Sequence, residues 1–338
     1  MTERAPDIHP DPSGMIQDIL AGNVMAGARL MRAIEAGNPQ ADLLLGQLYA
    51  HRGNAFVTGI TGPPGAGKST LISALITCFR QKNLTVGVVA VDPSSAQTGG
   101  AVLGDRVRMQ AHAGDPGVFI RSLAARGAAG GLARAAQDIC LVLDAMGYDV
   151  IVVEPVGSGQ ADMEICRMVH SLGLVAIPGT GDGIQSVKAG LLEAADVFIV
   201  NKNDLPGATS EVMTLEHLVN LRSVPPDTWQ PPVVSTCART GQGVDRLAER
   251  FLEHRGFMTD HGLLEKMRAD QAANHFNTLV RQMLLDRIDA WMDRHVAGFL
   301  GTAANQANVA ADPYRAARKL AARLTAHLDE ADETDREF

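Results

Sequence analysis

The feature that most constrains the fold of this 338-residue chain is a glycine-rich loop that follows a short hydrophobic run. The loop reads Gly62-Pro63-Pro64-Gly65-Ala66-Gly67-Lys68-Ser69-Thr70 and fits the pattern Gly-x-x-x-x-Gly-Lys-Ser. The run before it is typical of a strand, and the apolar spacing after it is typical of a helix. Glycines let successive backbone N–H groups turn toward phosphates at the positive end of that helix. We therefore expect Lys68 to reach the β- and γ-phosphates of a nucleotide and the Ser69 hydroxyl to bind Mg²⁺.

Short β-branched runs alternate with longer Ala- and Leu-rich segments through the middle of the chain. The expected strands cover residues 56–61, 86–91, 118–121, 150–154, 174–177, 197–201 and 233–236. Several are almost continuously hydrophobic, which indicates strands covered on both faces. The alternation predicts an α/β fold, a P-loop NTPase with a mostly parallel central sheet and right-handed crossovers.

The two ends of the chain show helical periodicity and no strand pattern. We predict an N-terminal helical extension over residues 1–54, a P-loop nucleotide-binding domain over 55–257 and a C-terminal helical dimerisation region over 258–328. A break is expected between Gly298 and Ala311, with a further helix from about Asp312. Residues 329–338 form an acidic tail.

A second motif indicates which nucleotide base the chain recognises. Asn201-Lys202-Asn203-Asp204 follows the hydrophobic run 197–200. A carboxylate at a strand end can accept the N1–H and the exocyclic amine of guanine, whereas adenine has no such pair of donors. We expect Asn201, Lys202 and Asp204 to recognise guanine. Ser235, Cys237 and Ala238, in the loop after residues 233–234, fit the segment that completes such a pocket.

Three acidic residues are candidates for the magnesium site. Glu154 ends the run 150–153 and Asp92 ends the run 88–91, and the carboxyl ends of parallel strands line the ligand crevice of an open α/β sheet. Asp105 lies in the glycine-rich stretch 98–105 and is a third candidate. With Ser69, these acids form the predicted metal-binding set.

Charge, cysteine content and hydropathy limit the partners and the cellular location that we expect for this chain. The formal charge is −8, which argues against nucleic acid as the main partner, because binding phosphates needs surplus Lys and Arg. The last ten residues hold six acids and one arginine, so much of this charge belongs to the tail.

The four cysteines are far apart and form no CxxC motif or Cys/His cluster. We find no apolar run near the ~20 residues of a membrane span and no signal peptide, so we expect a cytoplasmic protein without membrane contact.

The order of further motifs resembles a known family. These are Asp92-Pro93-Ser94-Ser95, Thr98-Gly99-Gly100, Leu103-Gly104-Asp105-Arg106, Glu154-Pro155-Val156-Gly157-Ser158-Gly159-Gln160, Pro178-Gly179, Gly181-Asp182, Ile184-Gln185, Lys188-Ala189-Gly190 and Asn201-Lys202-Asn203-Asp204. Together they resemble the GTPases associated with methylmalonyl-CoA mutase, the MeaB/ArgK family. The resemblance runs from about Thr58 to Asp204 and continues more loosely into the C-terminal helices.

The resemblance implies a G-protein chaperone of an adenosylcobalamin-dependent acyl-CoA mutase. Such a protein couples GTP binding and hydrolysis to loading of the cofactor and removal of damaged cobalamin, which the partner holds. It also implies a homodimer joined by C-terminal helices, and a region over residues 178–190 that passes the nucleotide state to the partner. Within the site, Gly157 belongs to the nucleotide-binding residues. Lys68, Glu154 and Gln160 are the catalytic candidates, with Gln160 positioning the attacking water.

Two positions depart from the family pattern. Pro155 stands where the family usually has Thr, and Ser158 where it usually has Val. Proline removes a backbone donor and stiffens the segment after Glu154. These changes put in question how the segment switches and which mutase it serves.

Three other functions fit parts of the same sequence. One is a metallocentre-maturation GTPase, although metal delivery generally uses the Cys and His clusters that this sequence does not show. A second is a kinase, for which no acceptor-site motif is apparent. The third is a nucleotide-sensing scaffold that binds GTP and barely hydrolyses it.

Overall fold

The computed structural model describes residues 12–92, 110–124, 129–155, 163, 166–179, 189–221, 225 and 227–323. The chain divides into two compact units, one ending at Gln271 and the other beginning at Ala272. Each unit is described by itself.

The first unit is built on a seven-stranded sheet in which every neighbouring pair of strands is parallel. The strand order is β3-β2-β4-β1-β5-β6-β7. The strands are β1 (Phe56–Thr61), β2 (Val86–Asp92), β3 (Val118–Ala124), β4 (Val150–Glu154), β5 (Ser171–Ala176), β6 (Val197–Val200) and β7 (Val233–Ser235). The predicted parallel α/β sheet is therefore confirmed, and β1 lies at its centre with β4 and β5 on either side.

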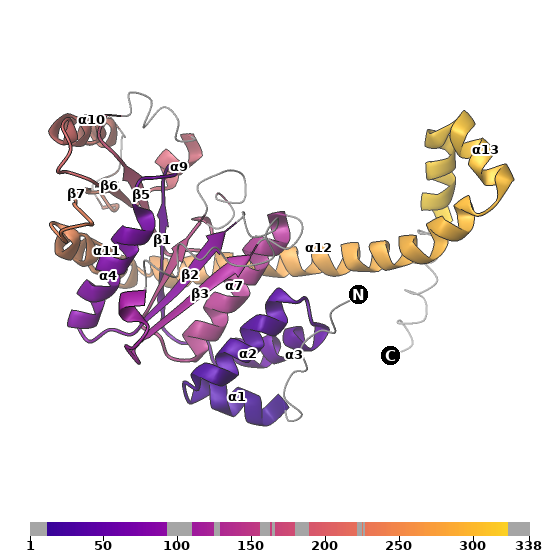
Figure 1. Ribbon diagram of the computed structural model, residues 1–338, viewed down its shortest axis with the longest axis horizontal. Helices are drawn as coiled ribbons and strands as arrows, with labels where there is room; N and C mark the ends of the chain where they lie inside the picture. Colours follow the sequence, from indigo (N-terminus) through magenta and orange to yellow (C-terminus); the bar gives the residue numbers. More distant parts are fainter. Residues whose placement is uncertain are drawn as a thin grey trace. The chain divides into compact units, whose positions relative to one another are not determined.

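Helices cover both faces of this sheet (Figure 1). On one face, α4 (Lys68–Gln81) and α11 (Val244–Asp260) pack over apolar strand residues such as Ile60, Val152 and Ile199. The opposite face lies under α7 (Ala129–Ala145), α9 (Ala189–Ala194) and α10 (Ala208–Asn220). Alternate residues of β4 divide between the two cores, as expected for a strand buried on both sides.

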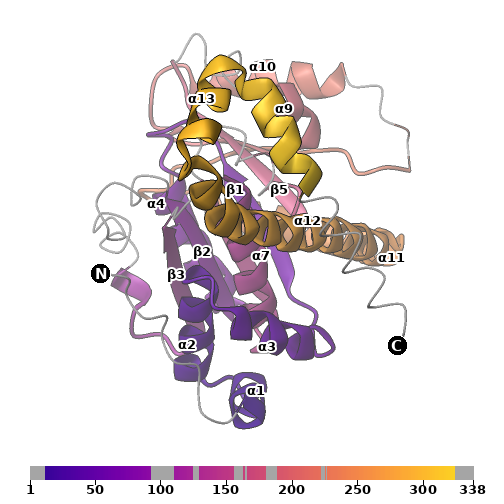
Figure 2. The ribbon, with the colours of Figure 1, turned by 90° about the vertical axis from the view of Figure 1, so that its right-hand side faces the viewer.

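The N-terminal extension forms three helices: α1 (Pro12–Leu20), α2 (Val24–Glu35) and α3 (Pro39–Tyr49). Asn23 and Asn38 cap the second and third helices, since their side-chain oxygens accept backbone N–H groups of the first turn. These helices share one hydrophobic core with α7 and the strands beneath it, and Figure 2 shows them beside α7. The Glu35–Arg121 ion pair, at 2.7 Å, also joins the extension to β3. The extension is thus a third layer on this side of the sheet.

The second unit is helical where it is described. The helix α12 (Leu263–Leu300) begins in the first unit and continues into the second, followed by α13 (Ala303–Ala311) and by helical residues 313–323. The break predicted over Gly298 to Ala311 is wrong in extent, because only Gly301 and Thr302 separate α12 from α13. Among the helices that the structure describes, none combines the length and the hydropathy needed to cross a membrane.

Candidate functional site

The glycine-rich loop lies between the central strand β1 and the first residue of α4. Gly62, Gly65 and Gly67 have positive φ angles of 150°, 75° and 83°. A Cβ atom on Gly62 would lie 2.4 Å from the Val175 carbonyl oxygen, and one on Gly67 would lie 2.8 Å from Asn201 Nδ2. Glycine at the first and last positions is therefore required both by backbone conformation and by space. Pro63, Pro64 and Ala66 complete the loop, and Thr70 lies in the first turn of α4.

Lys68 and Ser69 begin α4 and are both buried. The Lys68 ammonium group donates to the carbonyl oxygens of Gly62 and Pro63, at 2.9 and 3.3 Å. The Ser69 hydroxyl donates to Glu154 Oε1 at 2.9 Å. Glu154, also buried, ends β4, the strand next to β1, so strand order brings this carboxylate to the loop. The structure thus brings together three of the residues that the sequence predicts for phosphate and magnesium binding.

The oxygen donors of Ser69 and Glu154 fit a magnesium ion. Mg²⁺ takes oxygen ligands and usually keeps several waters, with one or two protein groups and the phosphates of the substrate completing its shell. A buried hydroxyl and a buried carboxylate in hydrogen-bond contact supply two such groups beside the phosphate-binding loop. Among the described residues there is no group of three or more His, Cys, Asp or Glu side chains that could hold a metal by themselves.

The other predicted acidic and switch residues are only partly described. Asp92 is the last residue of β2, and Ala90 of that strand is in register with Glu154. The backbone of Asp92 therefore lies at the same edge of the sheet as Glu154, while its side chain lies outside the description. Asp105, Gly157 and Gln160 fall outside the described residues, and so does most of the 178–190 region.

Asn201 ties the phosphate loop to the predicted guanine loop. It follows β6 and is only 1% exposed. Its Nδ2 donates to the Ala66 carbonyl at 2.8 Å, and its Oδ1 accepts from Thr236 Oγ1 at 3.2 Å and from the Ala238 N–H at 3.1 Å. Lys202 adds a second link, since its Nζ donates to the Gly65 carbonyl at 2.8 Å. One motif thus holds both loops in fixed positions.

Asp204 is more exposed and is held by two donors. The Cys237 thiol donates to Oδ1 at 3.3 Å, and the Arg239 guanidinium donates to Oδ2 at 3.0 Å. The hydrogen bond from Cys237 is the main cause that lowers the pKa of Asp204, with the charges of Arg239 and Lys202 adding to it. An ionised carboxylate with two oxygens is the acceptor that the N1–H and amine of guanine need.

The contacts that two residues make in this site were not predicted from the sequence. Thr236, fully buried, donates to Asn201, and Arg239 pairs with Asp204. Their positions beside Ser235 and Ala238 in the predicted guanine loop were the available signal. Ser235 is the last residue of β7, so it leads directly into this loop.

A parallel sheet whose central strand leads into this loop and helix defines the class of the protein as a P-loop NTPase. A sequence model of the family described as "Methylmalonyl Co-A mutase-associated GTPase MeaB" matches residues 27–293. The chain belongs to this family and is a GTPase of the MeaB/ArgK type, as its sequence predicts.

Relatives and a solved structure agree with this assignment. The chain is 42% identical to a putative GTPase of Pyrococcus abyssi over 308 residues, covering 90% of this chain and 94% of the relative. It is 34% identical to the GTPase ArgK of Escherichia coli, covering 78% of this chain and 82% of that protein. A crystal structure described as an LAO/AO transport system kinase superposes with a TM-score of 0.66 at 26% identity, covering 93% and 97% of the two chains.

Proposed function

We propose that the chain binds GTP and GDP at the site formed by the loop 62–70, Glu154 and the two guanine-side loops. The observation that carries this proposal is the hydrogen-bond set of Asn201, which fixes the phosphate loop and the guanine loop to each other. In this assignment Asp204 selects guanine, and Lys202 stabilises the phosphate loop. Ser235, Cys237 and Ala238 border the base.

Hydrolysis in such a site depends on positioning and on charge stabilisation. Lys68 lies at the loop with a buried ammonium group that can bind the β- and γ-phosphates. Ser69 and Glu154 would hold Mg²⁺ or its water shell, with Asp92 and Asp105 as further candidates. When bound, the ion neutralises charge on the phosphate oxygens. We assign Gly157 to nucleotide binding and Gln160 to orientation of the attacking water.

The family description supports a role with methylmalonyl-CoA mutase. We propose that this GTPase acts as a G-protein chaperone of an adenosylcobalamin-dependent acyl-CoA mutase, controlling cofactor loading and the removal of inactivated cobalamin. The cobalamin belongs to the mutase. Turnover is slow until the mutase binds, as expected of a switch that waits for its partner.

We propose that the protein forms a homodimer and that the second unit carries the contact between the two copies. Four apolar residues of α12 spaced along one helical stripe are exposed: Phe276, Val280, Met283 and Leu284, at 63%, 38%, 49% and 49%. An apolar helix stripe of this kind is typical of a protein–protein contact.

We also propose that the protein works in the cytoplasm. All four cysteines lie in the described part of the chain and carry free thiols, which is compatible with a reducing compartment.

The test is GTP hydrolysis by the purified full chain with and without a candidate acyl-CoA mutase, together with co-purification of the two proteins. We expect preference for GTP over ATP, a stable complex and faster hydrolysis in the presence of the mutase. Preference for ATP would refute the role of Asp204. Absence of both complex and rate change with methylmalonyl-CoA mutase and its close relatives would refute the chaperone role and leave the GTPase assignment intact.

A further inference from the structure

A groove of about 530 Å³ lies in the first unit, near the end of β6 that is opposite the nucleotide loops. Asp196 directly precedes β6, whereas Asn201 directly follows it, so the strand separates this groove from the candidate nucleotide site. We call it the α11–α12 groove, because most of its lining comes from the end of α11 and the start of α12. Its lining is Glu193, Ala195, Asp196, Thr228, Trp229, Pro231, His254, Phe257, Met258, Leu263, Lys266, Met267 and Asp270.

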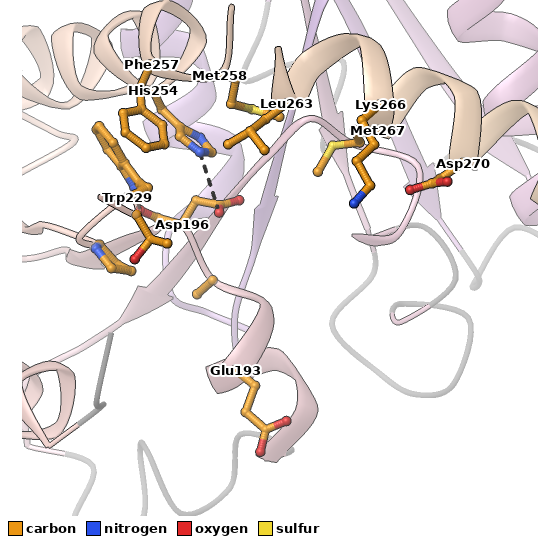
Figure 3. A pocket seen from close by; sticks show the side chains of 13 residues that line it. Glu193, Asp196, Trp229, His254, Phe257, Met258, Leu263, Lys266, Met267 and Asp270 are labelled. Carbon is orange, nitrogen blue, oxygen red and sulfur yellow. Dashed lines mark hydrogen bonds and ion pairs between the residues drawn. The ribbon is translucent and has the colours of Figure 1, made fainter. Parts of the chain in front are cut away.

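One wall of the groove is aromatic and firmly held (Figure 3). The indole N–H of Trp229 donates to the Asp196 carbonyl at 2.8 Å, and its ring lies 4.6 Å from the His254 ring and 5.7 Å from the Phe257 ring. His254 is fixed in turn by a 2.8 Å hydrogen bond between its Nδ1 and Ser171 Oγ. A tryptophan held in place before binding loses little conformational entropy when a partner side chain packs on it.

The charges around the groove are mostly negative. Three carboxylates line the groove, those of Glu193 on α9, Asp196 before β6 and Asp270 on α12, and the lining holds one ammonium group, that of Lys266. The Asp196 carboxylate lies 3.7 Å from His254 Nε2 (Figure 3). Burial lowers the pKa of His254 to about 4, so His254 is neutral at pH 7 and does not offset them. The remaining lining from α11 and α12 is apolar, chiefly Met258, Leu263 and Met267.

An aromatic wall, an excess of carboxylates and an apolar floor together favour a partner segment that carries an arginine and apolar side chains. An arginine can lay its planar guanidinium and aliphatic stem against Trp229 while it donates to a carboxylate at the rim. Neighbouring apolar side chains of the same segment would cover the exposed parts of Leu263 and Met267. The chain's own C-terminal tail does not fit, because six of its last ten residues are acidic.

We propose that the α11–α12 groove is a docking site for the acyl-CoA mutase, which inserts an arginine flanked by apolar side chains. This inference rests on the proposed function, since it names the surface on which the mutase binds. It places that surface away from the nucleotide loops, so partner binding and nucleotide binding can occur together.

The experiment measures the affinity of purified full-length chain for the purified mutase by titration calorimetry, with GTP present. The test variant carries Glu193→Lys and Asp270→Lys, which reverse two exposed rim charges without touching the aromatic wall. The matched control is Glu216→Lys, an exposed charge on α10 that does not line the groove. We expect the double variant to bind at least tenfold more weakly because like charges now meet, and the control to bind like wild type. Both should keep the wild-type rate of GTP hydrolysis measured without the mutase.

A photocrosslinking amino acid at the exposed position of Leu263 gives an independent measurement. We expect a crosslink to a mutase peptide that contains an arginine beside apolar residues. Wild-type affinity in the double variant, or crosslinks only to a second copy of this chain, would overturn the groove as the docking site while the chaperone role stands. If wild type itself does not bind the mutase, the proposed function fails and the groove assignment fails with it.

Discussion

Replacing Asn201 by alanine tests the link between the phosphate loop and the guanine loop. The substitution removes three hydrogen bonds and leaves the Ala66 carbonyl, the Thr236 hydroxyl and the Ala238 N–H without this partner. A net hydrogen bond contributes about 1 kcal/mol, and a buried group left unsatisfied costs more. We therefore expect the free energy of unfolding of the first unit to fall by about 3 kcal/mol. For a domain of this size that is a decrease in melting temperature of roughly 6–12 °C.

The assay combines thermal unfolding with titration of a fluorescent GDP analogue. Asn201→Ala should lower both the melting temperature and the nucleotide affinity, because the two loops lose their fixed spacing. The matched control is Asp204→Ala, in the same motif, where the side chain is 40% exposed. The control should lose guanine affinity with a change in melting temperature below about 2 °C, since exposed substitutions rarely exceed 0.5 kcal/mol. A variant at Asn201 that melts like wild type and binds normally would refute the reasoning.

Three further predictions follow from the same site and its surroundings. Lys68→Ala should weaken GTP binding by roughly 100-fold or more, because charge-assisted hydrogen bonds to phosphate are lost; retained turnover in a phosphate-release assay would exclude the assigned role. Asp204→Asn should reduce the preference for GTP over ATP by a similar factor, measured by competition binding, since an amide cannot accept both guanine donors; unchanged preference would move base selection elsewhere. His254 has a pKa lowered from 6.5 to about 4 by burial, so the unfolded chain binds more protons between these values. Stability should therefore decrease as the pH falls from 6.5 to 4, and His254→Gln should show a smaller drop between pH 7 and pH 5 in urea unfolding. If the free energy of unfolding falls equally in wild type and in His254→Gln, burial of His254 is not the cause of the pH dependence.

The sheet was predictable because its strands are continuous hydrophobic runs with clear boundaries. Residues 56–61 and 150–154 form strands over the ranges that their pattern predicts. The start of β5 was missed, since Ser171-Leu172-Gly173 has no β-branched residue. Contacts with distant residues explain why these three residues form a strand. Gly173 packs so closely that a Cβ atom there would lie 2.9 Å from both Ile199 Cδ1 and Phe251 Cζ, and the Ser171 hydroxyl is hydrogen-bonded to His254 of α11.

The candidate site was predictable as a set of motifs but not as a set of contacts. The order of the strands brings Glu154 to Ser69 across 85 residues of sequence, and no local pattern states which strand lies next to β1. The role of Thr236 was hidden for the same reason, because its partner Asn201 lies 35 residues away. The α11–α12 groove had no sequence signal, since its lining comes from four separate segments.

The shared core of α1–α3 and α7 has a consequence for how this GTPase can be dissected. A fragment that begins at the phosphate-binding strand would keep every nucleotide motif but would expose side chains that now lie against Leu30, Met31 and Leu48, each fully buried. Such a fragment would present a large apolar patch and would tend to aggregate. A fragment that keeps this core must therefore include α1–α3, which come before every residue that we assign to nucleotide binding.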